Sequence, residues 1–161
     1  MCRVSNVLFR HFALTRAYVI AIAMGLLFVA PVSSTLAQGH TVRGHIDQPV
    51  DGGRVPGRYE VSGTITHERL PDGYHLWIVV QVGVLMWPKE PEASVKGTSW
   101  YTPTPISEGG MGPYRLVLFL VDGTGQRSIK QWLRVGNATG DFRGLRTIIG
   151  GRALDSITVQ Q

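Results

Sequence analysis

Residues 75–82 read HLWIVVQV and residues 114–121 read YRLVLFLV, and these two octets decide the fold of the chain. Each is a short, almost continuously apolar run, and the first contains three valines and one isoleucine. Such runs are typical of strands that lie in the middle of a sheet and are buried on both faces. Turn-forming sequences adjoin them, PDG at 71–73 and DGTG at 122–125. The sequence therefore predicts two central strands.

Shorter strands are predicted around this pair. Residues 58–66 (RYEVSGTIT) alternate, with Tyr59, Val61 and Ile65 on one face, which is typical of a half-buried strand. Segments rich in proline or glycine, including 103–113 and 140–151, are predicted loops. The remaining predicted strands lie at residues 41–46, 84–87, 97–102 and 154–159.

One segment departs from the strand pattern. Residues 126–135 (QRSIKQWLRV) place Ile129, Trp132 and Leu133 at the i, i+3 and i+4 positions, which is the spacing of one helix face. Gly136-Asn137 follows and is suited to cap a helix. We expect one short surface helix that packs Trp132 and Leu133 on the sheet.

Strands separated by turns, without repeated helices, predict a mainly β chain: an antiparallel β-sandwich of six or seven strands with one helix. The start of the domain also resembles bacterial extracytoplasmic immunoglobulin-like and fibronectin-III-like domains. The residues that carry this resemblance are Ile46, Pro49, Asp51-Gly52, Val55 and Val61-Ser62-Gly63. It covers residues 46–121 and implies an Ig-like sandwich, although the chain has no cysteine pair and places a helix where the family has a loop. Such domains are mostly adhesive, spacer or binding modules, so the resemblance implies no reaction.

The first 37 residues have the features of a secretory signal peptide. Residues 17–30 form an uninterrupted apolar run, and small residues precede a cleavage site after Ala37. Positive charge before the run comes from Arg3, Arg10 and Arg16. The run is shorter than the about 20 residues that span a bilayer, which favours a signal peptide over a membrane anchor. An uncleaved anchor is the alternative. We expect a signal helix in residues 1–37 and one Ig-like domain in residues 38–161, located in the periplasm, in the cell envelope or outside the cell.

Charge and cysteine usage exclude several function classes. The chain has 16 basic and 11 acidic residues, and three basic residues but no acidic ones lie in residues 1–37. The remaining 13 against 11 form no basic run, which disfavours nucleic acid as a partner, and a membrane partner is not expected once the signal is removed. The single cysteine, Cys2, precedes the domain, so thiolate metal sites and cysteine nucleophiles are excluded there.

The polar residues form no recognisable catalytic or metal motif. The histidines His40, His45, His67 and His75 do not have the spacing of a zinc or copper site, so no metal ligand and no cofactor is predicted. The aspartates Asp122, Asp141 and Asp155 lie at expected turns and strand ends, where a side chain bonds its own backbone. No catalytic residue is predicted. A hydrolase-like enzyme remains an alternative. It requires two acidic side chains, or an acidic side chain and a histidine, within reach of one another in one cleft, and scattered positions of Asp122, Asp141, His67 and His75 would remove it.

Aromatic residues give the remaining functional signal. Trp77 and Trp132 occupy expected core positions. Trp100 and Tyr101 are adjacent in a strand, so they point to opposite faces and one of them faces outward. Trp87 ends a strand before Pro88. Trp87 with the outward member of the pair is therefore a candidate platform for a sugar or a peptide.

These observations predict an exported, non-catalytic binding or structural module of the bacterial envelope. Its expected partner is an envelope protein or a glycan. The first alternative is a glycan- or cell-wall-binding module that uses Trp87 with Trp100 or Tyr101. The second alternative is the hydrolase-like enzyme.

Overall fold

A computed structural model describes residues 41–109 and 112–161 of this chain. The predictions for residues 1–37, of a signal peptide or an anchor, lie outside the described residues, as does His40. Within the described ranges, no helix is long and apolar enough to cross a membrane. The elements are β1 (Gly44–Gln48), β2 (Arg58–Tyr59), β3 (Ser62–Ile65), β4 (His75–Val82), β5 (Leu85–Pro88), β6 (Ser94–Lys96), β7 (Ser99–Tyr101), β8 (Ile106–Ser107), β9 (Tyr114–Val121), α1 (Gly123–Thr139) and β10 (Gly151–Val159).

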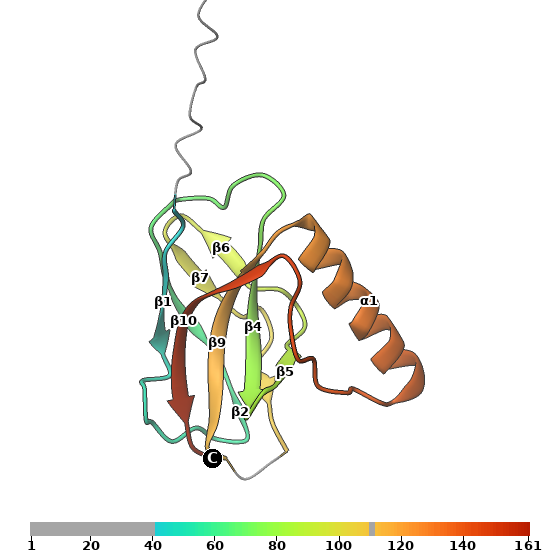
Figure 1. The fold of residues 1–161 in the computed structure, drawn as a ribbon. Coiled ribbons are helices and arrows are strands. Elements are labelled where there is room, and N and C mark those ends of the chain that lie inside the picture. Colours follow the sequence, from blue (N-terminus) through green and yellow to red (C-terminus); the bar gives the residue numbers. More distant parts are fainter. Residues whose placement is uncertain (1–40, 110–111) are drawn as a thin grey trace, which may run out of the picture. The chain divides into compact units, whose positions relative to one another are not determined.

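The strands form two four-stranded sheets and one small ribbon, and every ladder is antiparallel. The first sheet has the order β1-β3-β7-β6, and the second has the order β10-β9-β4-β5 (Figure 1). The ribbon pairs β2 with β8. In the second sheet, β4 and β9 pair along their length from His75↔Val121 to Gln81↔Arg115. The prediction of two central strands at 75–82 and 114–121 is confirmed.

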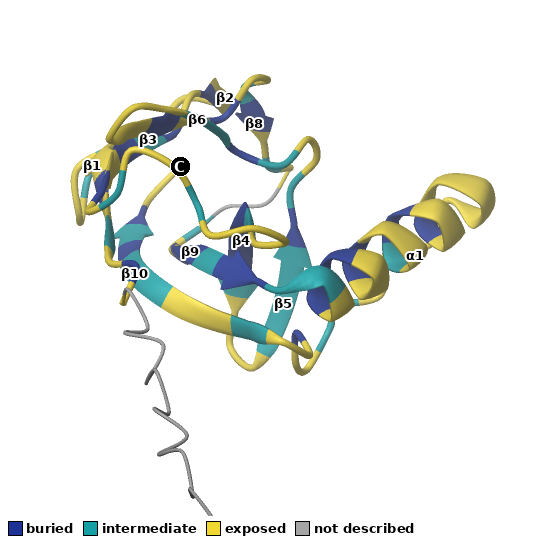
Figure 2. Cartoon of the chain, turned by 90° about the horizontal axis from the view of Figure 1, so that it is seen from above, coloured by how far each residue is buried: buried dark blue, intermediate teal, exposed yellow. Residues whose placement is uncertain are grey.

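Alternate residues of β4 face two different hydrophobic clusters. Ile78 and its even-numbered neighbours share one cluster with buried residues of the first sheet, among them Ile65 and Trp100. Trp77 and Val79 face the other cluster, which contains buried residues of α1. Because β4 is buried on both faces, its sequence shows no alternation. The arrangement is mainly antiparallel β and compatible with a β-sandwich, with α1 on the outer face of the second sheet (Figure 2).

The helix is longer than expected, and both predicted ends were wrong. Asp122 was expected in a turn, but its Oδ1 accepts hydrogen bonds from the backbone N–H groups of Thr124 (2.8 Å) and Gly125 (2.9 Å) and so caps the helix start. The helix continues through Gly136, where the cap was expected, and ends at Gly140 with φ of 73°. At Gly136 the ring of Phe142 occupies the space that a side chain would fill, which explains a glycine inside a helix.

We expected six or seven strands, whereas the described residues form ten strands. The predicted strand at 58–66 is two strands, because β2 pairs with β8 while β3 pairs with β1 and β7. Between them Val61 is fully buried, and its N–H donates to Thr102 Oγ1 (3.1 Å). No strand was predicted at β6, and β8 lies in the segment 103–113 that was predicted as a loop. Strands of two or three residues are too short to show a period.

Candidate ligand-binding site

Trp100 and Tyr101 point to opposite faces of β7, as their adjacency predicts. Trp100 is 1% exposed, and its Nε1 donates to the carbonyls of His45 (3.1 Å) and Thr64 (3.2 Å). The indole therefore joins β1 to β3 inside the core and is not accessible to a ligand. Tyr101 is the outward member of the pair and is 47% exposed.

Trp87 lies in β5 at the edge of the second sheet, whereas Tyr101 belongs to the first sheet. Trp87 is half-buried, and its Nε1 donates to the Phe142 carbonyl at 2.8 Å. One edge of its ring lies against Gly144, where a Cβ would approach Cζ2 to 2.7 Å. The pocket that Trp87 lines does not include Tyr101. Trp87 thus has aromatic partners other than those that the sequence suggested.

A pocket of about 250 Å³ lies between β5 and α1. Three aromatic side chains from separate segments line it: Trp87 from β5, Trp132 from α1 and Phe142 from the following loop. Trp132 and Phe142 pack edge to face, with ring centroids 5.5 Å apart and an interplanar angle of 67°. We call this site the aromatic pocket. Its other lining residues are Pro88, Lys89, Glu90, Leu133 and Asn137.

The backbone of the loop after α1 holds both indoles of the aromatic pocket. Trp132 Nε1 donates to the Arg143 carbonyl at 2.8 Å, and Trp87 Nε1 donates to the Phe142 carbonyl one residue earlier. The same loop joins β5 through paired backbone hydrogen bonds between Met86 and Leu145. Both indole N–H groups already have acceptors within the protein. A ligand in the pocket would therefore contact the rings through their apolar surfaces.

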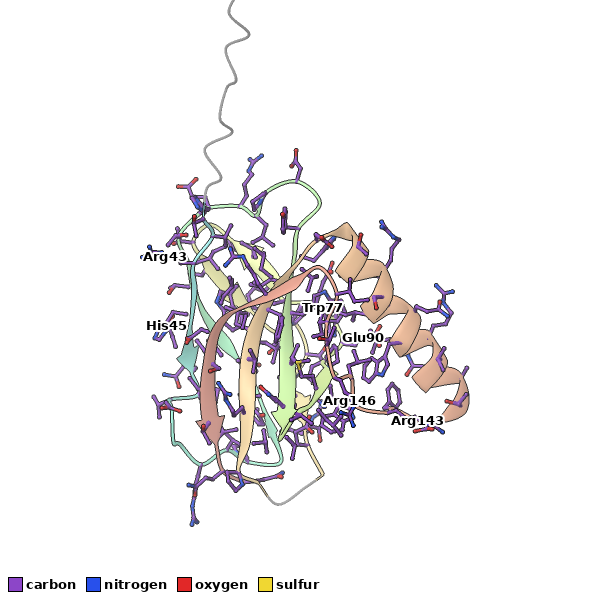
Figure 3. The ribbon with its side chains drawn as sticks, viewed as in Figure 1. Arg43, His45, Trp77, Glu90, Arg143 and Arg146 are labelled. Carbon is purple, nitrogen blue, oxygen red and sulfur yellow. The ribbon has the colours of Figure 1, made fainter. Side chains whose placement is uncertain are left out.

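Polar side chains complete the aromatic pocket. Glu90 and Asn137 are exposed, and neither side chain forms a hydrogen bond or an ion pair with another described residue. Lys89 is instead engaged in an ion pair with Glu108. Figure 3 shows Glu90 between the second sheet and α1, with Arg143 and Arg146 toward the C-terminal end of the helix. The arrangement combines apolar ring surfaces with a free carboxylate and a free amide.

A second polar cluster connects β4 with the start of α1. His75 Nδ1 lies 3.1 Å from Glu92 Oε2, and the same oxygen accepts a hydrogen bond from Gln126 Nε2. Gln126 Oε1 in turn accepts from the buried Trp77 Nε1 at 2.6 Å. His75 and Glu92 also line a depression of about 270 Å³, together with Glu68. Sequence reasoning named His75 but missed Glu92, which no motif marks.

The four residues named for the hydrolase-like alternative have separate surroundings, although His75 and Glu92 are a histidine and an acid within reach of one another in one depression. Asp122 caps α1, and Asp141 pairs with Arg143 on the surface at 2.8 Å. His67 lines a different depression, formed by residues 67–72. None of these three lines the depression that contains His75. Across residues 41–109 and 112–161, no group of three or more His, Cys, Asp or Glu side chains is placed to hold a metal ion.

Two other sets of hydrogen-bonded side chains connect parts of the fold and line none of the pockets described above. The Tyr59 and Tyr114 hydroxyls lie 3.0 Å apart in the core. Burial, together with this hydrogen bond, raises the pKa of Tyr59 far above its usual value, and burial also raises the pKa of Tyr114. Asp155 joins the edge strands β1 and β10, because its Oδ2 accepts from Ile46 N (2.8 Å) and lies 2.7 Å from His45 Nδ1.

Sequence reasoning found one of the three rings in the aromatic pocket. It placed Trp132 in the core, where its helix spacing pointed, and gave no role to Phe142. Comparison of the chain with protein-family models, with curated proteins and with solved structures found no match. The functional argument therefore depends on the chain's own geometry.

Proposed function

We propose that this chain is an exported, non-catalytic module that binds a carbohydrate of the cell envelope in the aromatic pocket. The observation that carries the proposal is the convergence of Trp87, Trp132 and Phe142 around one pocket. Sugar rings present C–H faces that stack on aromatic rings, and their hydroxyls require hydrogen-bond partners at the edge. Glu90 and Asn137 have side chains free to supply those partners.

The size of the aromatic pocket limits what it holds. Its volume of about 250 Å³ is close to the lower end of small-molecule sites, about 300 Å³. We expect it to hold one sugar ring of a longer chain, with the remainder of the polymer outside. This is the behaviour of a module that anchors itself to a polymer rather than enclosing a free metabolite.

The fold and location in this proposal rest on the sequence as well. The two antiparallel sheets with a shared core support an Ig-like sandwich, to which residues 46–121 have the resemblance described above. The apolar run at 17–30 and the small residues before Ala37 support export. The non-catalytic assignment is supported by the structural use of Glu92, whose carboxylate is bonded to Gln126.

The test is the retention of the full-length chain, kept soluble in mild detergent, by soluble polysaccharides in native gels. Asn137→Ala removes an exposed amide and should weaken retention roughly fivefold, the worth of one hydrogen bond, without a change in unfolding temperature. Trp87→Ala should abolish retention. Tyr101→Ala removes an exposed aromatic ring outside the aromatic pocket and serves as the control, so it should leave retention unchanged.

Two results would overturn the proposal. Retention by none of the polysaccharides would exclude a carbohydrate ligand, and capture of one envelope protein instead would make the chain a protein-binding module. Loss of retention in Tyr101→Ala, with none in Asn137→Ala, would move the binding surface from the aromatic pocket to β7.

A further inference from the structure

Positive charge is concentrated in α1 and the segment after it. Residues 123–152 contain six basic residues and one acidic residue, whereas the rest of residues 38–161 contains seven basic and ten acidic residues. The near-neutral total therefore conceals two regions of opposite sign. The six basic residues are Arg127, Lys130, Arg134, Arg143, Arg146 and Arg152.

The basic residues of α1 lie on its outward face. Arg127, Lys130 and Arg134 follow at spacings of three and four residues, so they are neighbours on one side of the helix. All three are exposed, while Ile129 and Leu133 are buried against the second sheet. No acidic residue lies in α1 to neutralise this face.

Half of these cations have no partner among the described residues. Arg127 donates to Thr124 Oγ1 and Arg143 pairs with Asp141. In contrast, the side chains of Lys130, Arg134 and Arg146 are exposed and form no hydrogen bond or ion pair with any residue that the structure describes. Three unpaired cations on α1 and the segment after it attract anionic groups.

The unpaired cations lead to the aromatic pocket. Asn137, which lines the pocket, follows Arg134 by three residues and Lys130 by seven, so these three share one helix face. Arg146 follows Leu145, whose backbone pairs with Met86 next to Trp87. A polymer with one ring in the pocket would extend either along α1 or along β5. In both directions it would pass unpaired basic side chains.

We propose that the carbohydrate is an acidic polysaccharide, whose carboxylate groups contact Lys130, Arg134 and Arg146 while one sugar ring occupies the aromatic pocket. This inference rests on the proposed function and names the class of its ligand. A lipid surface fits less well, because α1 buries its apolar face against the sheet and an interfacial helix needs that face free. The free carboxylate of Glu90 favours sugar hydroxyls over the dense phosphates of a nucleic acid.

The test compares polymers that differ only in charge. Polygalacturonate, alginate and hyaluronate are each paired with a carboxyl-reduced, neutral form, and the full-length chain in mild detergent is titrated with each. The triple variant Lys130→Gln, Arg134→Gln, Arg146→Gln removes the three unpaired cations. The matched control Lys96→Gln, Arg43→Gln, Arg58→Gln removes the same net charge from exposed positions outside residues 123–152.

We expect at least one acidic polymer to bind more tightly than its neutral form, and added salt to reduce the difference. The first triple variant should lose roughly tenfold in affinity for that acidic polymer, the worth of three modest exposed ion pairs, while its affinity for the neutral form stays unchanged. The control variant should keep the preference.

Contrary outcomes separate the two proposals. Equal binding of acidic and neutral forms, or equal loss in both triple variants, would overturn the charge inference and leave the carbohydrate pocket standing. No binding to any polymer would overturn the proposed function itself. Preferential binding of single-stranded oligo(dT), or of phosphatidylglycerol vesicles through the same three cations, would replace the polysaccharide with a nucleic acid or a lipid surface.

Discussion

Replacing Gln126 with leucine should weaken the attachment of α1 to the second sheet. Gln126 is 5% exposed and accepts a hydrogen bond from the indole of Trp77, which is itself 2% exposed. Without that acceptor the buried indole N–H has no partner, which costs about 1–3 kcal/mol. The bond to Glu92 is lost as well, but the side chain of Glu92 is 40% exposed, so water replaces most of this hydrogen bond.

Leucine recovers part of this cost through its greater hydrophobicity, so we expect a net loss of about 2 kcal/mol in the free energy of unfolding. For a domain of this size, that loss lowers the unfolding temperature by roughly 8 °C. Urea unfolding followed by circular dichroism gives the free energy, and amide hydrogen exchange tells whether α1 opens before the sheets.

Two further variants isolate the cause. Gln131→Leu makes the same substitution at an exposed position of α1 and should change stability by less than about 0.5 kcal/mol. Gln126→Glu keeps an acceptor for Trp77 but sets a second carboxylate against Glu92, so its stability should fall at neutral pH and recover when carboxylates are protonated. Equal stability of Gln126→Leu and the unmodified chain would refute the reasoning.

Three other predictions concern the stability of the fold. Asp122→Ala removes the cap of α1 and should cost about 1 kcal/mol, measured by urea unfolding. Gly63→Ala would place a Cβ 1.9 Å from the His45 carbonyl oxygen and should destabilise the β1–β3 pairing by about 3 kcal/mol or more, measured by thermal unfolding. Because burial raises the pKa of Tyr59 above that of an unfolded tyrosine, this residue's contribution to stability is complete below about pH 10 and is lost as pH rises further; Tyr59→Phe should lose less stability between pH 10 and 11.5.

Each of these predictions has a result that contradicts it. A fully stable Asp122→Ala would mean that the helix start does not depend on its cap. Gly109→Ala, whose Cβ would meet nothing within 4 Å, is the control for Gly63→Ala, and equal effects of the two would exclude a specific clash. Parallel alkaline unfolding curves for Tyr59→Phe and the unmodified chain would assign the alkaline transition to other groups.

The predictable part of the fold was the part with strong local signals. The octets at 75–82 and 114–121 have enough apolar residues that their assignment needed no tertiary information, and both became central strands. Short strands such as β8 are set by pairing with distant residues, here with β2, and leave no local pattern. The helix ends were wrong because Asp-Gly and Gly-Asn sequences suit turns as well as caps.

The candidate site was less predictable than the fold, because it is assembled by tertiary contacts. Trp87 carried a local signal, a tryptophan at a strand end before Pro88. Trp132 has the helix spacing of a core residue, and only the packing of α1 against β5 shows that it is also a pocket wall. Phe142 lies in a loop, and its position depends on the Met86–Leu145 pairing, which the sequence does not reveal.

The most direct test of the central claim uses the four tryptophans of the chain as reporters. In a ¹⁵N NMR titration of the full-length chain with short oligosaccharides prepared from a polysaccharide that retains it, each indole N–H gives a separate signal. We predict that the signals of Trp87 and Trp132 shift, because their rings line the aromatic pocket, while those of Trp77 and Trp100, which are 2% and 1% exposed, stay in place. Shifts confined to Trp77 and Trp100, or no indole shift under saturating ligand, would contradict binding in the aromatic pocket.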